Sequence, residues 1–375
     1  MWTFVSVCLD HFGVHRTAML RWCCSTEEER AAIEVDRKIN KMLREHARLL
    51  RRECSMCIIG MDNSGKTTLF RQMQMIHEGG YSVQSRKAFA ETVFQNVFTA
   101  IKALTKAMIT LNIPYSSPEN QLDAQWIQDV ETRQVTTLEA RHTDAIRRLW
   151  ADPGIRTCYG RRREFQLLDS TEYFMNNLDR IAAPGYVPTD QDVLRAKTSA
   201  NKSVEYSFDT GEHFLRIFEP DLFHNRRFRH IMMEANFFIF VASLSEYDQF
   251  GPWSSNPPDP FEHLVREGAQ CFCSCVNNGI FQHIPFILFL NKTDILAEKI
   301  QTSDLQTYFP EFTGKKGDAE AAMDFIRGLY LSRVHVESKQ LYVHFTCAID
   351  TESIRQVFND IKGNVLNKYL KNCLL

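Results

Sequence analysis

The sequence predicts an α/β protein whose doubly wound parallel sheet is interrupted, after its first strand and helix, by an all-helical block. A short apolar run at 54–59 leads directly into the glycine-bracketed segment 60–68, GMDNSGKTT, which is followed by apolar residues at helical spacing. Strand-like segments reappear only from residue 204 onward, where they alternate with helical stretches. Between them, residues 82–194 show helical periodicity punctuated by Pro and Gly. These three observations are typical of a doubly wound sheet that carries a helical insertion.

Length and composition exclude several classes of protein. The chain has 375 residues and a formal net charge of −2, so it lacks the basic surplus of a nucleic-acid-binding protein. Its 11 cysteines show no regular spacing, which favours free thiols in a reducing compartment over a disulfide scaffold. No apolar run approaches the roughly 18 to 20 residues that span a membrane. We expect a cytosolic protein, or one held at a membrane surface, with no nucleic acid among its partners.

Ahead of the sheet, the chain is expected to begin with an extension, 1–24, and a charged helix, 25–53. Ser25 and Thr26 are each followed three residues later by a glutamate, which is a doubled capping-box signature. The second half of this helix is rich in Arg and Lys. Such charge favours either an anionic membrane surface or a solvated face matched to the helix dipole, and the sequence leaves both interpretations open.

The segment 60–68, called the phosphate cradle below, has the pattern G-x-x-x-x-G-K-[ST]. Gly60 and Gly65 let successive backbone N–H groups curl around a phosphate because no Cβ stands in the way. Lys66 can neutralise the outer phosphates, and Thr67 at the start of the helix can bind Mg²⁺ through its hydroxyl. The alternative is an ordinary Gly/Ser turn before a helix, and the strand pattern ahead of the segment argues against it.

The remaining elements follow in order from apolar spacing and turn residues. Apolar side chains from Phe89 to Met108 form one helical stripe, which indicates core rather than a cofactor site. Asp152-Pro-Gly154 and Pro184-Gly185 are interpreted as punctuation. Further helices are expected at 121–133, 138–150, 170–181 and about 354–370. Strands are expected at 204–208, 214–218, 237–243, 286–290 and 342–346.

A second motif, Asn291-Lys292-Thr293-Asp294, follows the strand expected at 286–290. Groups at the carboxyl end of a parallel strand face the ligand crevice of such sheets. The carboxylate of Asp294 can accept hydrogen bonds from both donors on the guanine edge, whereas adenine lacks those donors. The four-residue match is weak alone, but it gains weight from the phosphate cradle and from Thr346-Cys347-Ala348 at another strand end. Together these segments predict a guanine-nucleotide site.

These motifs and three longer stretches resemble the α subunits of heterotrimeric G proteins, from about residue 25 to the C-terminus. The stretches are DNSGKTTLFRQMQMIHEGGYS, NNLDRIAAPGYVPTDQDVLRAK and FVASLSEYDQ. The resemblance implies a Ras-like GTPase domain at 54–81 and 195–375, a helical domain at 82–194, and binding of GTP or GDP with Mg²⁺. Thr67 would bind the metal. The nucleotide would contact Gly60, Met61, Asp62, Asn63, Ser64, Gly65, Lys66, Thr67, Thr68, Asp169, Ser170, Leu194, Arg195, Asn291, Lys292, Asp294 and Ala348.

The first switch of that family is altered in this chain. Lys197 stands where the family has its catalytic arginine, and a lysine lacks the planar fork that bridges phosphate oxygens. Ala200 stands where a threonine would bind Mg²⁺, and alanine cannot coordinate a metal. A shifted register that uses Thr198 or Ser199 would restore a hydroxyl, and we consider it the less favoured alternative.

The second switch departs further. Where the family reads Asp-Val-Gly-Gly-Gln, this chain reads Glu219-Pro220-Asp221-Leu222-Phe223. Glu219 falls at a further position of the expected Mg²⁺ shell. Leu222 replaces a glycine whose N–H would meet the γ-phosphate, and Phe223 replaces the glutamine that would orient the attacking water. We therefore expect GTP hydrolysis to be slow or absent.

The resemblance also implies partners at both ends of the chain. Cys23 and Cys24 lie in the family's N-terminal acylation region and are candidate palmitoylation sites, with two inert thiols as the alternative. Trp2 and Trp22 occupy the places where a myristoylated glycine would be expected. The N-terminal helix would bind the β subunit of a βγ dimer, and the tail 365–375 would insert into a G protein-coupled receptor. The implied location is the cytoplasmic face of the plasma membrane.

Three functions are open at this point. The first is a signalling α subunit with slow hydrolysis, and the second is a non-catalytic module that holds a βγ dimer or a receptor regardless of nucleotide. A kinase or ATPase with the same cradle is a remote third, because 291–294 favours guanine.

Two cysteine patterns are interpreted as unrelated to chemistry. The pair Cys54-x-x-Cys57 is expected in the core, and no metal site is expected at Cys271, Cys273 and Cys275.

Overall fold

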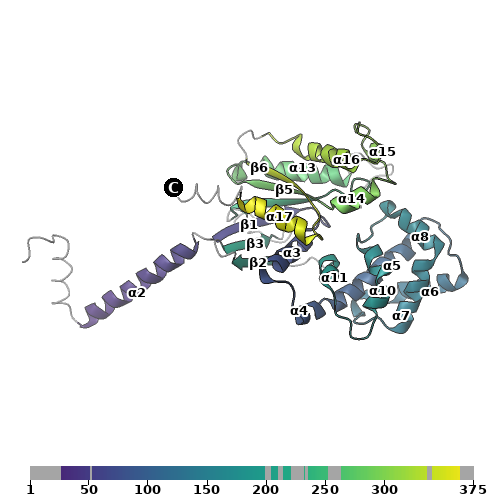
Figure 1. Ribbon diagram of the computed structural model, residues 1–375, viewed down its shortest axis with the longest axis horizontal. Coiled ribbons are helices and arrows are strands. Elements are labelled where there is room, and N and C mark those ends of the chain that lie inside the picture. The colour runs from purple at the N-terminus through teal and green to yellow at the C-terminus, as the bar shows by residue number, and fades with distance from the viewer. Residues whose placement is uncertain are drawn as a thin grey trace, which may run out of the picture. The chain divides into compact units, whose positions relative to one another are not determined.

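The computed structural model of the protein describes most of the chain (Figure 1). The described residues are 27–50, 53–198, 204–209, 214–220, 232, 235–251, 263–335 and 340–363. Several predictions fall outside this part of the chain. They concern Cys23 and Cys24, Ala200, Phe223 and the tail 365–375.

A six-stranded sheet, in the order β2-β3-β1-β4-β5-β6, forms the centre of the fold in the described residues. β1, β4, β5 and β6 pair in parallel, with Ile239 of β4 opposite both Ile58 of β1 and Ile287 of β5. Every residue of β4 and β5 is buried, as in a parallel sheet covered on both faces. The strands are β1 (Glu53–Gly60), β2 (Val204–Asp209), β3 (Phe214–Glu219), β4 (Phe237–Ser243), β5 (Phe286–Asn291) and β6 (Leu341–Thr346).

Helices cover both faces of this sheet (Figure 1). On one face, α3 (Lys66–Glu78) and α17 (Thr351–Ile361) pack through Leu69, Phe70 and Phe358. The other face is covered by α13 (Leu264–Val276), α14 (Thr293–Lys299), α15 (Leu305–Tyr308) and α16 (Ala319–Leu331). The predicted doubly wound α/β fold is therefore confirmed, with each predicted strand present within one residue of its expected bounds.

A separate all-helical block lies between α3 and β2 in the sequence and has its own core. Val93, Val97, Ile101 and Leu104 form the predicted buried stripe of its longest helix. The inserted helical block of the predicted fold is thus confirmed. Its helices are α4 (Val83–Lys87), α5 (Ala90–Thr110), α6 (Pro118–Asp129), α7 (Ala140–Ala151), α8 (Pro153–Gly160), α9 (Thr171–Asn176), α10 (Leu178–Ile181) and α11 (Asp190–Arg195).

Some helix bounds differ from the prediction because capping residues begin helices earlier than apolar spacing indicates. α6 begins at Pro118, where Ser117 accepts a hydrogen bond from the N–H of Asn120, and it ends at Asp129 rather than at 133. α17 begins at Thr351 because Asp350 caps it in the same way. Proline at the first helical position is favourable, so it marks a start rather than a break.

One interpretation of the helical block is confirmed and another was wrong. Asp152 has extended backbone angles and separates α7 from α8, as predicted, and its carboxylate accepts a hydrogen bond from the N–H of Gly154 in the first turn of α8. The helix predicted at 170–181 is two short helices, α9 and α10, which meet at Asn177. The side-chain amide of Asn177 donates to the carbonyl of Tyr173, four residues earlier, which is how asparagine competes with helical hydrogen bonding.

The N-terminal helix α2 (Glu27–Leu50) is one continuous element. Its side chains are mostly polar, as predicted, but Val35, Ile39, Met42 and Leu43 are exposed apolar residues at helical spacing. They form a narrow apolar stripe on this helix. No helix among the described residues is long and apolar enough to cross a membrane.

Candidate functional site

The phosphate cradle connects the end of β1 to the start of α3 through two glycines that no other residue could replace. Gly60 has φ +145°, and a Cβ there would lie 2.2 Å from the carbonyl oxygen of Val241. Gly65 has φ +107°, and a Cβ there would lie 2.2 Å from Nδ2 of Asn291. Gly65 also begins α3 without a side-chain cap. The first amides of a helix of 13 residues therefore face an open loop, as an anion site requires.

Lys66 uses its three N–H donors inside the protein. The ammonium donates to the carbonyl oxygens of Gly60 and Met61, at 2.9 Å each, and lies 3.5 Å from Oε1 of Glu219. Burial raises the pKa of Glu219, with Lys66 opposing the shift and Asp62 reinforcing it. The ammonium thus sits at the end of β3, where it bridges the cradle and a carboxylate.

Two hydroxyl groups of the cradle are available for a ligand. Thr67, in the first turn of α3, is exposed. The hydroxyl of Ser64 is buried and has no hydrogen-bond partner among the residues that the structure describes. A buried polar atom without a partner is costly in a finished core, so this hydroxyl fits a loop that is completed by a bound anion. The cradle therefore passes a direct test of fit to a nucleotide phosphate.

Asn291, at the end of β5, ties the cradle to the loop that follows β6. Its side chain is 2% exposed. The amide donates to the carbonyl of Ser64 at 2.8 Å, and its oxygen accepts from the N–H of Ala348 at 2.9 Å and from the hydroxyl of Thr346 at 3.2 Å. The two predicted motifs and the 346–348 segment are thus brought together at one edge of the sheet, as the sequence predicts.

Lys292 forms an ion pair with the helical block. Its ammonium lies 2.6 Å from Oδ2 of Asp169 and 4.0 Å from Oε1 of Glu246. Burial lowers the pKa of Lys292, but the two carboxylates outweigh it and the net shift is upward. Burial raises the pKa of Glu246 to about 7, although Lys292 opposes that shift. Asp169 was predicted at the nucleotide site, whereas Glu246 was not.

The backbone carbonyls of Leu194 and Arg195, two predicted site residues, accept hydrogen bonds from side-chain hydroxyls. The hydroxyl of Thr68 donates to the carbonyl of Leu194 at 3.2 Å, and the hydroxyl of Ser170 donates to the carbonyl of Arg195 at 3.1 Å. The guanidinium of Arg195 lies 4.5 Å from the ring centroid of Tyr173. The segment 194–195 is therefore held from both α3 and α9.

The backbone around Lys197 is clamped by two residues that the sequence analysis missed. Asn96 of α5 accepts from the N–H of Lys197 at 2.5 Å and donates to its carbonyl at 2.9 Å. Arg71 of α3 is buried and donates to the carbonyls of Val193, at 2.8 Å, and Ala196. The side chain of Lys197 remains exposed. A polar residue inside the apolar stripe of α5 was the only sequence signal for this clamp.

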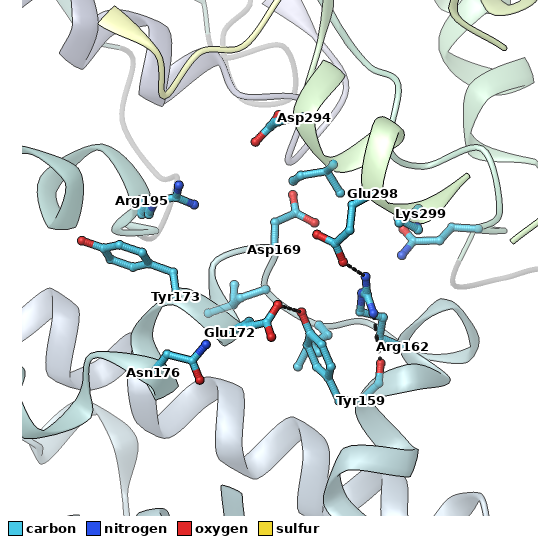
Figure 2. A pocket seen from close by; sticks show the side chains of 14 residues that line it. Tyr159, Arg162, Asp169, Glu172, Tyr173, Asn176, Arg195, Asp294, Glu298 and Lys299 are labelled. Atoms are coloured by element: carbon cyan, nitrogen blue, oxygen red, sulfur yellow. Dashed lines mark hydrogen bonds and ion pairs between the residues drawn. The ribbon is translucent and has the colours of Figure 1, made fainter. Parts of the chain in front are cut away.

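A pocket of about 350 Å³ lies between residues of α9 and α14 and is lined by several of the predicted site residues (Figure 2). Asp169, Arg195 and Asp294, all predicted, are among the residues that line it. Across the pocket, Arg162 donates to Oε1 of Glu298 at 2.7 Å, which the sequence analysis did not predict. Glu298 lies one helical turn after Asp294 on α14, so the motif and this ion pair share one helix face.

The two cysteines of β1 are placed as expected. Cys54 and Cys57 are both 0% exposed, so their interpretation as core residues is confirmed. Cys273 of α13 is buried, while Cys271 and Cys275 are half-buried. Within the described residues, three or more Cys, His, Asp or Glu side chains do not gather into a metal-binding cluster.

Comparison with known proteins agrees with this geometry. The family model for the G-protein alpha subunit matches residues 33–365. The guanine nucleotide-binding protein subunit alpha-15 of Oryctolagus cuniculus is 42% identical over 364 residues, which cover 93% of this chain and 96% of the relative. The subunit alpha-15 of Homo sapiens is 41% identical over 371 residues, 95% of this chain and 98% of the relative.

Proposed function

Because the chain belongs to the family of G-protein α subunits, we propose that it is the guanine-nucleotide-binding subunit of a heterotrimeric G protein, that it transduces signals from G protein-coupled receptors, and that its GTP hydrolysis is impaired. The observation that carries this proposal is an intact phosphate cradle tied to Asn291, in a chain whose sequence is rewritten at 219–223. The domain division is part of the proposal: a GTPase domain at 54–81 and 195–375, and a helical domain at 82–194.

We propose the following residues as those that would hold GDP or GTP. The backbone N–H groups of the cradle would bind the phosphates, and Asp294 would accept from the guanine edge beside the pocket. Asn291 keeps the base loop and the cradle in register. Thr67 offers a hydroxyl and Glu219 a carboxylate to Mg²⁺, which when bound supplies charge neutralisation for the phosphates.

Impaired hydrolysis follows from the side chains that the chain lacks. Lys197 is held in place by its backbone, yet its ammonium is a point charge that cannot form the bidentate contacts of an arginine. In Ras and Gα proteins, the catalytic arginine raises the rate of GTP hydrolysis roughly 10³- to 10⁵-fold. This magnitude was established on those proteins and is applied here to a chain of the Gα family. Phe223 can neither donate to nor accept from an attacking water. The two changes remove both hydrolytic devices.

Single-turnover hydrolysis of bound GTP tests this proposal. We expect phosphate release from the unaltered chain to be at least about 10³-fold slower than from a family member with both devices. A Lys197→Arg/Phe223→Gln variant is expected to recover part of the rate. Lys106→Arg, an exposed substitution on α5, is the matched control and should recover nothing. Hydrolysis by the unaltered chain at the usual rate of the family would refute the proposal.

The second candidate is a scaffold that binds a βγ dimer or a receptor regardless of nucleotide. The apolar stripe of α2 favours a helix-binding partner, since Val35, Ile39, Met42 and Leu43 are exposed. Binding of purified βγ dimer in GDP and in a non-hydrolysable GTP analogue distinguishes the two functions. Equal affinity in both nucleotides supports the scaffold, and weaker binding with the triphosphate supports a switching subunit.

Attachment to the plasma membrane is proposed from the sequence. Cys23 and Cys24 would carry palmitate, and the helix 25–53 would add basic charge and the βγ contact. The tail 365–375 would engage the receptor. Labelling of cells with a palmitate analogue tests the first point. Incorporation that persists unchanged in a Cys23→Ser/Cys24→Ser variant, or that is absent from the unaltered chain, would remove palmitoylation from the proposal.

A further inference from the structure

The ion pair between Lys66 and Glu219 connects the phosphate site to the altered second switch. Both side chains are largely buried, with exposures of 12% and 23%. The remaining two donors of Lys66 are taken by the carbonyl oxygens of Gly60 and Met61. Lysine has three donors and no acceptor. The ammonium can therefore bind a phosphate only by giving up one of these partners. A phosphate oxygen carries negative charge, as the carboxylate of Glu219 does, so the carboxylate is the partner that it would replace.

We propose that Glu219 competes with nucleotide phosphate for Lys66 and makes the site prefer a guanosine diphosphate over a triphosphate. This inference rests on the proposed guanine-nucleotide function and adds a specificity-determining residue to it. The family has an aspartate at this position, as the sequence comparison above describes. A glutamate extends one methylene further from β3 than an aspartate does, and its carboxylate oxygen Oε1 lies 3.5 Å from the ammonium of Lys66.

The charges around Glu219 explain why the third phosphate is affected most. Asp62, in the cradle, acts on Glu219 as a second negative charge, and Lys66 is the positive charge that opposes its effect. The thiol of Cys57, on the neighbouring strand, stays neutral because burial raises its pKa. A triphosphate brings more negative charge than a diphosphate to this excess of carboxylate. At a partly buried site, one additional repulsion of this kind changes an equilibrium on the order of tenfold to a hundredfold.

Equilibrium binding to the purified full-length chain tests the inference. GDP and a non-hydrolysable GTP analogue are titrated into the unaltered chain, Glu219→Gln and Glu219→Asp, first with a chelator and then with Mg²⁺. In the chelator, Glu219→Gln is expected to raise affinity for the triphosphate, relative to GDP, about tenfold or more. Glu219→Asp keeps the charge but withdraws it from Lys66. Its ratio of triphosphate to GDP affinity should therefore lie between those of the unaltered chain and of Glu219→Gln.

Glu205→Gln is the matched control. Glu205 lies on β2 and pairs with Arg216, at 2.7 Å, rather than with Lys66. Glu205→Gln removes one carboxylate from the same sheet, so the ratio of the triphosphate affinity to the GDP affinity should not change. Thermal midpoints of the four proteins check that each is folded.

The outcomes separate the inference from the function on which it rests. If every protein binds GDP and Glu219→Gln leaves the affinity ratio unchanged, the competition is refuted and the guanine-nucleotide function stands. If Glu219→Gln leaves the ratio unchanged in the chelator and weakens triphosphate binding only with Mg²⁺, the carboxylate serves the metal shell alone, and the competition is likewise refuted. If neither the unaltered chain nor the variants bind either nucleotide, the proposed function falls, and the inference falls with it.

Discussion

Replacing Asn291 by alanine should show how far the nucleotide site depends on one buried amide. The side chain is 2% exposed and serves the carbonyl of Ser64 and the N–H of Ala348. Asn291→Ala leaves both backbone groups without a partner. Each buried polar group left unpaired costs roughly 1 to 3 kcal/mol. We therefore expect the free energy of unfolding to fall by about 3 kcal/mol, since costs within one network do not simply add.

The same substitution should weaken nucleotide binding. The cradle would lose the contact that holds its backbone against the 346–348 segment, so we expect GDP affinity to fall at least about tenfold, which corresponds to about 1.4 kcal/mol. Urea denaturation followed by circular dichroism measures the stability, and fluorescence titration measures the affinity.

Asn277→Ala is the control for this experiment. Asn277 also bridges two backbone groups, since it donates to the carbonyl of Arg333 at 2.8 Å and accepts from the N–H of His335 at 3.1 Å. These bonds lie at the surface, where water can replace the amide, so the cost should stay below about 1 kcal/mol. A cost for Asn291→Ala equal to that of Asn277→Ala, with GDP affinity unchanged, would refute the reasoning.

Three further substitutions have defined outcomes. Gly65→Ala places a Cβ 2.2 Å from Nδ2 of Asn291 at φ +107°, so GDP titration should show at least about a tenfold loss of affinity. Ionisation of Glu246, whose pKa burial raises to about 7, should lower the free energy of unfolding by up to about 3 kcal/mol as pH rises from about 4.5 through 7. Urea denaturation at several pH values should show that decline in the unaltered chain and not in Glu246→Gln. Asp248→Asn leaves the buried ammonium of Lys299 without its carboxylate, so it should cost about 3 to 5 kcal/mol in urea denaturation, and much less when combined with Lys299→Met. A cost for the double variant as large as for the single one would contradict the last prediction.

The strands and the cradle could be predicted from the sequence because their signals are local. Buried parallel strands are continuous apolar runs, and each glycine of the cradle is required by its own backbone geometry. Asn291 was located because its motif follows such a run. Helix bounds were less accurate, since Ser117 and Asp350 cap helices that begin three residues before the starts predicted from apolar spacing.

The contacts between the inserted helical block and the sheet domain could not be predicted from local sequence signals. Arg71 and Asn96 are single polar residues whose partners are backbone atoms more than a hundred residues away in the sequence. Arg162 and Glu298 each have an ordinary surface-like sequence setting, and only the fold brings them together at 2.7 Å. No spacing rule connects such pairs, because the distance along the chain is set by the inserted helical block.

Equilibrium binding of GDP and of a non-hydrolysable GTP analogue to the unaltered chain, with and without Mg²⁺, tests the central claim most directly. The account predicts that both nucleotides bind and that the triphosphate binds less tightly than GDP, most clearly without Mg²⁺. Glu219 is the reason, since its carboxylate pairs with Lys66 and adds negative charge at the phosphate site. Triphosphate binding at least as tight as that of GDP in the absence of Mg²⁺ would contradict the account.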